Sequence, residues 1–452
     1  MAEQMKPSGI DWIKDIPSSW EINKVKYLAT EPGTLFLDGD WIESDVIEES
    51  GIRYLTTGNV GAGFYKEQGS GYISEKTFSE LHCLNVYPGD LMISRLNEPI
   101  GRACIIPDTE SRYVVAVDNV ILRPNTNYNK KFIMYGMNAD GYAEHANMIA
   151  RGATMSRISR SQLGQFWLAF PNIEEQQAIA DFLDKECAQI DSVAADLEKQ
   201  IALLQQYKKS LITETVTKGL DKSVPMKDSG VEWIGEIPVG WELSRIKYLT
   251  DNHHPYPIGD GDHGMIKADD YLTEGIPYIR VLNLTWGSGL NLENLVFISK
   301  EMNSLIKNSE LKPNDILIAK TGATIGKTAI VPDSLPVSNT TSHVGKITLA
   351  NVHDAKYFYY VMTSSIVQKQ IQDISAMQST RPELGIEGLK NLILTVPPFD
   401  IQQHIARFLD DHCAKIDRVL HEKGKQLSVI KQHKKSLIYE YVTGKKRVKE
   451  VQ

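Results

Sequence analysis

The chain carries the sequence PNIEEQQAIADFLDKECAQIDSVAADLEKQIALLQQYKKSLITETVTK at residues 171–218, and a second version, PPFDIQQHIARFLDDHCAKIDRVLHEKGKQLSVIKQHKKSLIYEYVTG, at residues 397–444. The two stretches are identical at 24 of their 48 positions. Agreement of this extent is far beyond chance, so the chain contains an internal duplication.

Each copy has the pattern of one long helix. The first copy has no glycine or proline between residues 172 and 218, and its apolar residues recur at alternating spacings of three and four. A helix of about 40 residues is roughly 60 Å long, too long to bury its apolar seam on one small domain. We therefore expect the copies to pair as an antiparallel coiled coil. The predicted seam comprises Leu183, Ile190, Leu197, Leu204, Leu211, Leu409, Ile416, Ile430 and Leu437.

The charges of the two copies favour this pairing. Residues 171–218 carry 5 basic and 9 acidic side chains, a net charge of −4, whereas residues 397–449 carry 12 basic and 6 acidic side chains, a net charge of +6. Opposite net charges attract across a helix interface. The basic tail Lys445-Lys446-Arg447 is alternatively available to contact DNA or a partner subunit.

A shorter duplication opens each half of the chain. Residues Ser8 to Leu28 return as Ser229 to Leu249, with 11 of 21 positions identical. Between the repeated segments the halves diverge, and only a faint echo joins residues 87–108 to residues 312–333. We expect a variable domain at 1–170, a helix at 171–217, a second variable domain at 218–395 and a second helix at 396–446. Such a duplication predicts a pseudo-two-fold molecule.

The variable domains show short β-rich runs separated by Gly, Asn and Pro turns. We expect strands within residues 51–60, 90–94 and 113–123, and within residues 276–284, 315–320 and 344–349. Short helices are expected at residues 131–150 and 355–373. The predicted fold class is mixed α/β (α+β), with recognition carried by loops.

Composition limits the class of protein. The chain has 452 residues, of which 42% are hydrophobic and 23% are charged, as in an ordinary globular protein. No run approaches the roughly 18 to 20 apolar residues of a membrane helix, and the opening MAEQMKPSGIDWIKDIP has no apolar core. We expect a cytoplasmic protein with no membrane contact and with its four separated cysteines reduced. The net charge of −8 argues against coating nucleic acid by bulk charge.

Four motifs suggest catalysis or ligand binding, and a simpler reading is preferred for each. Residues 321–328, TGATIGKT, lack one residue of a phosphate-binding P-loop, so we expect a turn between two strands, with Lys327 or its counterpart Arg102 directed to solvent or a phosphate. Asp333, Asp354 and Lys356 resemble a nuclease constellation, but the first half lacks the second acid. Residues 396–399, VPPF, lack the polar first residue of an amino-methyltransferase loop. The histidines and aspartates of residues 253–263 read as a polar loop, and we predict no metal site or catalytic residue.

What remains is recognition chemistry. Arginine and asparagine form bidentate hydrogen bonds with the edges of guanine and adenine. Thr154 and Thr380 align shortly before the two repeated helices, which raises the surrounding arginines above ordinary surface charge. The candidate DNA-binding residues are Arg95, Asn97, Arg151, Arg157, Arg160, Arg280, Asn283, Lys320, Thr321 and Arg381.

The whole chain resembles the specificity subunits of type I restriction-modification enzymes. Two divergent domains each open with a W-I…I-P…W-E segment and close with a P-x-x-x-x-Q-Q-x-I-A-x-F-L-D helix. By this resemblance, residues 176–180 and 402–406 match the entry to the family's two central helices, and the variable domains match its target-recognition domains. The family fold implied is two target-recognition domains joined by the two helices.

The resemblance also implies partners. In that family each domain reads one half of a bipartite, asymmetric site in double-stranded DNA. Modification subunits methylate adenine with S-adenosylmethionine, and restriction subunits use ATP and Mg²⁺ to translocate and cut. This chain would then hold no cofactor of its own. The variable domains are net acidic, with −5 for residues 29–170 and −3 for residues 250–396, so their basic residues must gather on one face, or partner subunits must neutralise phosphates.

Two other readings stay open. The chain could be the recognition portion of a fused restriction-methyltransferase, which catalytic motifs elsewhere on the natural chain would favour. It could instead be a structural coiled-coil scaffold, which sequence-selective DNA binding with partners would exclude.

Overall fold

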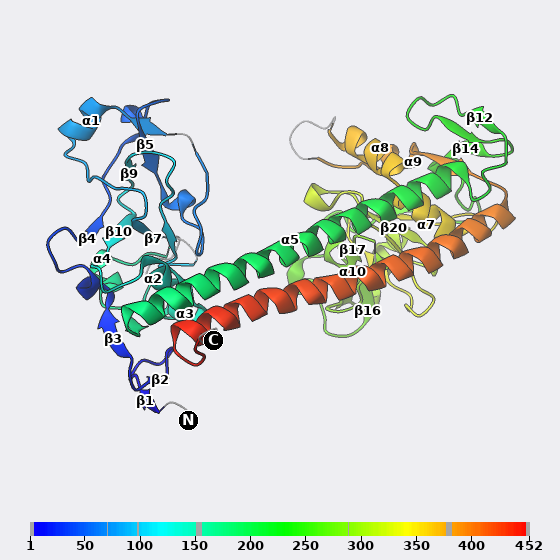
Figure 1. Ribbon diagram of the computed structural model, residues 1–452. Helices are drawn as coiled ribbons and strands as arrows, with labels where there is room; N and C mark the ends of the chain where they lie inside the picture. The colour runs from blue at the N-terminus through cyan, green and yellow to red at the C-terminus, as the bar shows by residue number, and fades with distance from the viewer. Residues whose placement is uncertain are drawn as a thin grey trace. The chain divides into compact units, whose positions relative to one another are not determined.

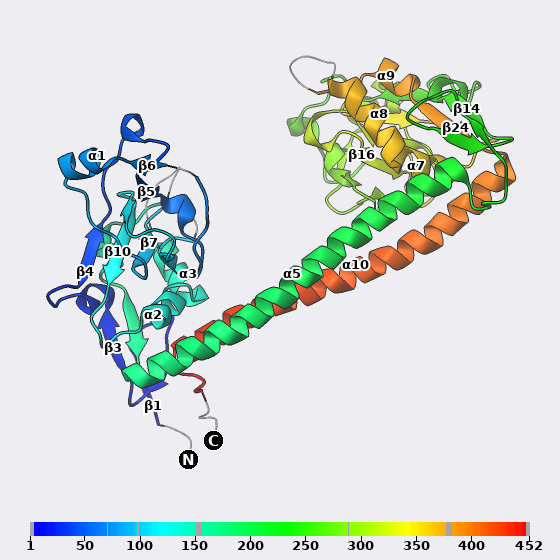
Figure 2. The ribbon, with the colours of Figure 1, turned by 45° about the horizontal axis from the view of Figure 1, so that its top comes forward.

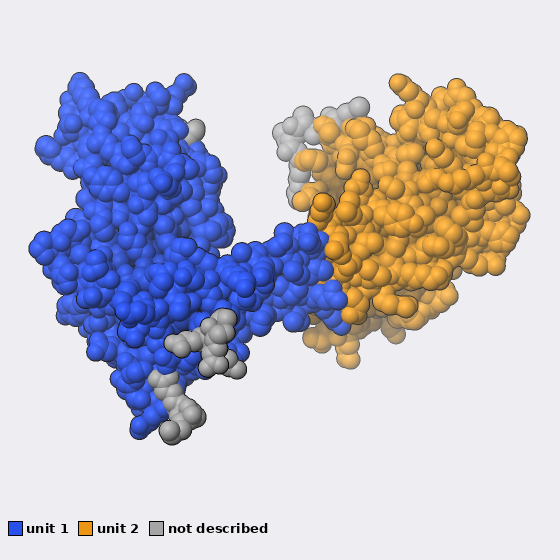
Figure 3. All heavy atoms as spheres, viewed as in Figure 1, with its two compact units in different colours: residues 1–198, 425–452 blue, residues 199–424 orange. Residues whose placement is uncertain are grey.

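The computed structural model describes residues 4–69, 71–96, 99–150, 156–287, 289–376 and 382–448. The chain divides into two compact units, shown in blue and orange in Figure 3. Unit 1 comprises residues 1–198 and 425–452, and unit 2 comprises residues 199–424. The borders between the units therefore fall inside the two duplicated segments.

The duplicated segments form two long helices, α5 (Ile173–Lys218) and α10 (Phe399–Val442), as Figures 1 and 2 show. Each helix begins two residues after the first proline of its copy, and Asn172 Oδ1 accepts a hydrogen bond from the Glu175 N–H to cap α5. Each is followed by a glycine in the left-handed region, Gly219 at φ +75° and Gly444 at φ +70°. The mixed fold with two long helices packed together is confirmed.

Within each unit, half of α5 runs antiparallel to half of α10. In unit 1 Lys434 Nζ donates to Asp191 at 2.6 Å, and in unit 2 Lys208 Nζ donates to Asp417 at 2.6 Å. The offset of the duplication relates these two ion pairs to each other. Lys431 pairs with Glu198 in unit 1, so acidic side chains of α5 meet basic side chains of α10, as the net charges predict.

The predicted seam residues all lie on α5 or α10, and each is buried or half-buried. Leu183 and Leu437 belong to the core of unit 1, and Leu409 to the core of unit 2. Leu197 and Ile416 are each 8% exposed. The other predicted seam residues, Ile190, Leu204, Leu211 and Ile430, are half-buried.

Gly424 lies in the interior of α10, and a Cβ added there would meet no atom within 4 Å. Glycine inside a helix is less stable than alanine by about 0.5–1 kcal/mol. We expect Gly424→Ala to raise the free energy of unfolding by that amount, measured by denaturant unfolding. Gly219→Ala is the matched control and should destabilise, because its φ is positive and the new Cβ would lie 3.2 Å from Trp241. Equal effects of the two substitutions would contradict this reading of the helix.

Among the described residues, unit 1 contains two sheets of more than two strands. The four-stranded antiparallel sheet has the order β4-β10-β7-β8, and the three-stranded sheet has the order β6-β5-β9, with β5 and β9 parallel. Two-stranded pairs β1-β2 and β3-β11 lie at the start and the end of the domain. The strands are β1 (Met5–Pro7), β2 (Asp15–Pro17), β3 (Glu21–Lys24), β4 (Leu35–Asp38), β5 (Ile52–Leu55), β6 (Tyr72–Ile73), β7 (Leu91–Ser94), β8 (Ala103–Ile105), β9 (Tyr113–Val115), β10 (Asn119–Arg123) and β11 (Trp167–Phe170).

Unit 2 repeats this topology despite its divergent sequence. Its sheets have the orders β15-β23-β20-β21 and β19-β16-β22, with β16 and β22 parallel, and it adds a hairpin, β17-β18. The strands are β12 (Met226–Asp228), β13 (Glu236–Pro238), β14 (Glu242–Arg245), β15 (Ile258–Asp260), β16 (Ile276–Ile279), β17 (Leu284–Thr285), β18 (Gly289–Leu290), β19 (Val296–Ile298), β20 (Ile316–Ala319), β21 (Thr328–Ile330), β22 (Asn339–Thr340), β23 (Val344–Ile347) and β24 (Ile393–Val396). β12 pairs with β13, and β14 pairs with β24. The two-fold relation between the units stays a prediction.

Short helices cover these sheets. They are α1 (Glu75–Glu80), α2 (Lys130–Met137), α3 (Asp140–Ile149) and α4 (Arg160–Leu163) in unit 1, and α6 (Lys300–Leu305), α7 (Ala355–Thr363), α8 (Ser365–Ala376) and α9 (Ile386–Lys390) in unit 2. The helices expected at residues 131–150 and 355–373 are each two helices, because the extended Ala139 and Ser364 interrupt them.

Three predicted β runs are also interrupted. The run expected at residues 113–123 is two strands in different sheets, because a turn closed by the Asn119 N–H and the Ala116 carbonyl separates them. The runs at residues 51–60 and 276–284 each leave the strand for a 3-10 turn after four residues.

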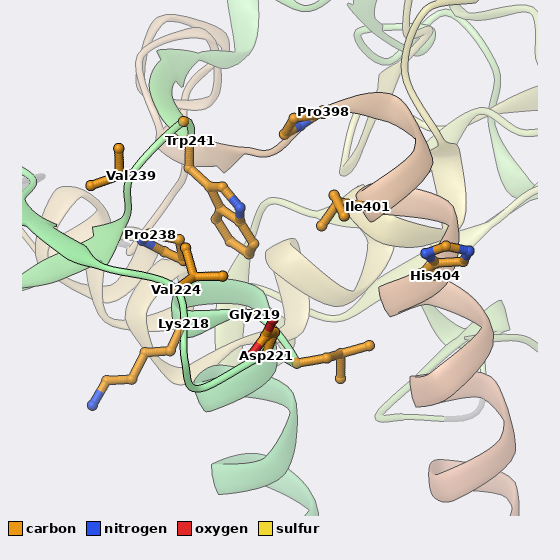
Figure 4. A pocket seen from close by; sticks show the side chains of 12 residues that line it. Lys218, Gly219, Asp221, Val224, Pro238, Val239, Trp241, Pro398, Ile401 and His404 are labelled. Atoms are coloured by element: carbon orange, nitrogen blue, oxygen red, sulfur yellow. The ribbon is translucent and has the colours of Figure 1, made fainter.

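The opening segment of each half packs on the end of a long helix. Trp20 is fully buried, and a Cβ on Gly444, just after α10, would lie 3.3 Å from its ring. Trp241 has the same relation to Gly219, just after α5. Beside Trp241, unit 2 has an open pocket of about 370 Å³ that also contacts Pro238 and Ile401 (Figure 4).

In unit 1 the basic tail lies against this opening segment. Lys445 Nζ donates to the Ile13 carbonyl at 3.1 Å, and Arg447 pairs with Glu175, the counterpart of Ile401. Lys446 pairs with Glu440 at 2.8 Å, so all three tail cations are engaged inside unit 1, and the tail is a structural segment rather than a free basic patch.

Candidate nucleic-acid interface

The Q-Q motif that opens each long helix anchors that helix to its domain. Gln176 is 1% exposed, and its Oε1 accepts a hydrogen bond from the N–H of Asn129, the N-cap residue of α2, at 2.9 Å. Gln402 repeats this contact with Asp354, the N-cap residue of α7, at 2.9 Å. The sequence identified the motif but not this role.

A second anchor lies two turns further along each helix. Asp184 Oδ1 accepts a hydrogen bond from the hydroxyl of Tyr135 at 2.7 Å, and Asp410 accepts one from Tyr360 at 2.8 Å. Burial and the facing carboxylate both raise the pKa of these phenols, so they stay protonated donors. Lys131 and Lys356 add ion pairs to the same aspartates. The duplicated helix residues therefore hold each domain to its helix in both units.

Divergent charged residues gather at one edge of the four-stranded sheet in unit 1. Strands β4 and β7 end at this edge and β10 begins there, because Asp38 pairs with Val120 and Ser94 with Asn119. We call the residues placed there the charged edge. They are Asp38, Arg95, Asp118, Arg157 and Arg160.

Arg95 is the buried centre of the charged edge. It is 6% exposed, and its Nε lies 3.3 Å from Asp38. Burial lowers the pKa of Arg95, the neighbouring Asp38 opposes this shift, and the nearby Arg157 adds to it. Arg157 is exposed and lies 3.1 Å from Asp118, while Arg160 lies 3.5 Å from Asp38. The edge thus presents arginine side chains held by aspartates.

Unit 2 has different chemistry at the same edge. Lys320 and Asp260, the counterparts of Arg95 and Asp38, form a buried ion pair. His263 lies 3.1 Å from Asp260, and the hydroxyl of Thr321 lies 3.1 Å from Nδ1 of His343, the counterpart of Asp118. The shared scaffold therefore carries two chemically unlike surfaces at this edge.

Burial corrects three of the predicted DNA contacts. Asn283 is fully buried, and its side chain accepts from the Arg280 N–H and donates to the Asn291 carbonyl. Lys320 is 2% exposed and Arg95 is 6% exposed. Side chains so enclosed do not extend to the edges of bases: Lys320 and Arg95 are held by ion pairs with aspartates, and Asn283 holds the loop after β16.

Arg102, which was expected to point to solvent or a phosphate, is 9% exposed. Its guanidinium donates to backbone carbonyls, including those of Val60 and Leu96. The expectation for Arg102 was therefore wrong.

The other predicted contacts divide between accessible and undescribed positions. Arg157 is exposed, and Arg160 and Thr321 are half-buried. Arg280 lies over the ring of Tyr271 and donates to the Asn294 carbonyl at 3.1 Å. Asn97, Arg151 and Arg381 lie outside the described residues.

The sequence analysis did not single out the residue of unit 1 that corresponds to Asn283. Asn59 is its counterpart, is 1% exposed and donates to the Lys66 and Gln68 carbonyls. Each asparagine fixes the loop that follows the central strand of a three-stranded sheet. An asparagine retained at offset 224 between two otherwise divergent regions was the available signal.

The P-loop-like motif has a structural explanation. Residues 320–327 form the connection between β20 and β21, which confirms the turn predicted in place of a P-loop. Within the described ranges, no three His, Cys, Asp or Glu side chains are placed to hold a metal ion. The four cysteines are buried free thiols, and burial raises the pKa of Cys104 to about 12. No helix in the described part of the chain has both the length and the apolar character needed to cross a bilayer.

Known proteins share both the sequence pattern and the fold. The EcoBI type I specificity subunit of Escherichia coli is 26% identical over 70% of this chain and 66% of its own length, just under two thirds. The MjaIX type I specificity subunit of Methanocaldococcus jannaschii is 23% identical over 97% of this chain and 96% of its own. A solved chain from work on assembly and conformational transition of the type I R-M system has a TM-score of 0.70, with 13% identity, over 94% of this chain and 98% of its own.

A family model supports the same relationship in both halves of the chain. The model of the type I restriction modification DNA specificity domain matches residues 21–203 and again residues 258–428. Each match contains one four-stranded sheet and most of one long helix. On these matches, the chain belongs to the family of type I restriction-modification DNA specificity subunits.

Proposed function

We propose that this subunit reads a bipartite, asymmetric site in double-stranded DNA, with one half-site read by each recognition domain. The observation that carries the proposal is the pair of family matches on two domains of one topology but unlike charged edges. We retain 1–170 and 218–395 as the proposed recognition domains, and 171–217 and 396–446 as the proposed central segments. We propose that the subunit acts on DNA in the cytoplasm.

Catalysis belongs to partner subunits in this proposal. Modification subunits would bind S-adenosylmethionine and methylate adenine, and restriction subunits would use ATP and Mg²⁺. The long helices and the anchors at Gln176 and Gln402 support a scaffold role, because they fix each recognition domain to a helix. The purified chain alone is expected neither to methylate nor to cut DNA.

Exchange of one recognition domain tests the proposal. Replacing residues 29–170 with the matching region of another family member should change one half-site and leave the other intact, because each domain has its own core. Maps of methylated adenine in cells carrying the chimaera and a modification subunit would reveal the site. Alteration of both half-sites would show that the domains do not read independently.

Arg157→Ala should weaken specific binding by about 1–3 kcal/mol if the arginine contacts a base. Arg157 is the exposed arginine of the charged edge, and Asp118 holds it at 3.1 Å. Binding of the assembled complex to its site and to a scrambled duplex would be compared over a salt series. An equal loss of affinity on both duplexes would indicate a phosphate contact. An unchanged affinity would show that Arg157 does not contact DNA. Arg381 also stays a proposed DNA contact, and Arg381→Ala would be tested in the same way.

A further inference from the structure

A pocket opens beside the charged edge of unit 1. Its volume is about 440 Å³, and its wall includes Lys26, Asp38, Arg95, Arg160, Ser161 and Gly164. Three of these side chains are cationic and one is anionic, so the pocket has an excess of two positive charges. This is notable because the surrounding residues 29–170 carry 12 basic and 17 acidic side chains.

Arg95 is built into the wall of this pocket. Only 6% of its surface is exposed, and its Nη2 donates a hydrogen bond to the Val117 carbonyl. Its Nε forms an ion pair with Asp38 Oδ1 at 3.3 Å, and both atoms are buried. The ion pair and the hydrogen bond fix the Arg95 guanidinium in the wall, so its positive charge is held beside the pocket.

The small residues of the wall keep the pocket open. A Cβ added to Gly164 would lie 3.0 Å from the Phe36 ring and 3.1 Å from Lys26 Cβ. The counterparts of Arg160, Ser161 and Gly164 in unit 2 are Ile386, Glu387 and Lys390. There the added carboxylate and ammonium pair with each other at 2.7 Å. The shared fold therefore does not require this pocket, which is a property of the first domain.

We propose that the Arg95 pocket binds one phosphate of the DNA backbone next to the half-site read by the first recognition domain. The inference rests on the proposed function and deepens it. A phosphodiester brings the negative charge that offsets the two excess positive charges of the pocket wall, and a phosphate contact fixes the register of a protein on DNA. The exposed Arg157 lies on the same charged edge, so it would be next to the bound DNA backbone. A net-acidic domain thus neutralises a phosphate locally.

The test uses the complex of this chain with its modification subunits and a duplex carrying its mapped site. Single phosphates in and around the first half-site are replaced in turn by uncharged methylphosphonates. One replacement should weaken wild-type binding by about 10-fold, as loss of a phosphate contact does. Ser161→Glu, which introduces the carboxylate of the unit 2 counterpart on a surface residue, should weaken binding to unmodified DNA by a similar factor. On the duplex with that one methylphosphonate, wild type and Ser161→Glu should bind alike.

Arg160→Gln is a second variant and should lower the slope of log affinity against log salt by about one. Arg112→Gln is its matched control, since Arg112 contacts Glu75 and Phe78, neither of which lines the pocket, and its affinity should be unchanged. Inorganic phosphate at constant ionic strength should not compete with DNA.

Three results would overturn the inference. Ser161→Glu could lose the same affinity relative to wild type at every methylphosphonate position, or Arg112→Gln could lose as much affinity as Arg160→Gln. The third is competition by inorganic phosphate when no methylphosphonate position removes the difference between wild type and Ser161→Glu. A complex with no sequence-selective binding to any duplex would instead contradict the proposed function itself.

Discussion

Inserting four residues into both long helices, between Glu198 and Lys199 and between Gly424 and Lys425, should lengthen the unread spacer of the DNA site by one base pair. Both half-site sequences should be retained. Methylation at sites with the original spacer should fall by about 100-fold or more, because engagement of one half-site is lost and each lost base pair costs about 1–3 kcal/mol.

The geometry of helices and DNA gives this expectation. Four residues extend a helix by about 6 Å and turn it by about 40° beyond a full turn. One base pair advances DNA by about 3.4 Å and turns it by roughly 35°. The rotations match, and the remaining translation of about 2.6 Å must be absorbed near Gly219 or Pro225, at the end of α5.

The contacts between the helices determine where the insertion belongs. Within unit 2, Lys423 of α10 donates to Gln200 of α5, and Lys208 of α5 donates to Asp417 of α10. An insertion in α5 alone, between residues 200 and 205, would shift Gln200 relative to Lys208, so both contacts could not be kept. Matched insertions at the borders of the units leave every such pair intact.

Maps of methylated adenine in cells carrying the double insertion provide the measurement. A seven-residue double insertion is the control, because it preserves the heptad phase but adds about 10.5 Å with a rotation about 20° short of two turns. Three base pairs span that distance but turn by roughly 105°, so methylation should be lost. An active four-residue variant with an unchanged spacer would show that these helices do not set the distance.

Trp20→Ala should lower the free energy of unfolding of unit 1 by about 3–5 kcal/mol. Trp20 is fully buried, its ring meets Phe132 of α2 edge to face at 6.1 Å, and it packs beside Gly444 at the end of α10. Truncation therefore opens a cavity where the opening segment, the domain and the helix end meet.

Hydrogen exchange of unit 1 amides under mild denaturant would measure this loss, and unit 2 amides provide an internal reference. Trp41→Ala is the matched control, because Trp41 is 68% exposed and its loss should change stability by less than about 0.5 kcal/mol. Similar effects of the two substitutions would mean that the Trp20 contact does not hold the unit together.

Local sequence patterns predicted the framework because they depend on spacing along the chain. The three-and-four spacing around Leu183 and Leu409 was enough to identify both long helices, and the glycine and turn pattern of residues 320–327 was enough to identify the connection between two strands. The motifs of the two halves also identified the family, which the matches over residues 21–203 and 258–428 show.

The fate of polar side chains depended on contacts that spacing does not encode. Lys320 and Asp260 are 60 residues apart in sequence, and only the sheet brings them together and buries them. Asn283 looked like a base reader, yet the fold uses it to satisfy buried backbone groups. Gln176 marked the family but gave no sign that it would accept a hydrogen bond from Asn129, 47 residues earlier.

The sequence by itself thus determined the duplication, the helices and the kind of protein. Tertiary structure alone decided where the units divide, which arginines stay accessible and where the Arg95 pocket opens. The physical reason is that helix periodicity follows from neighbours three and four residues away, whereas burial of a charge follows from partners that folding supplies.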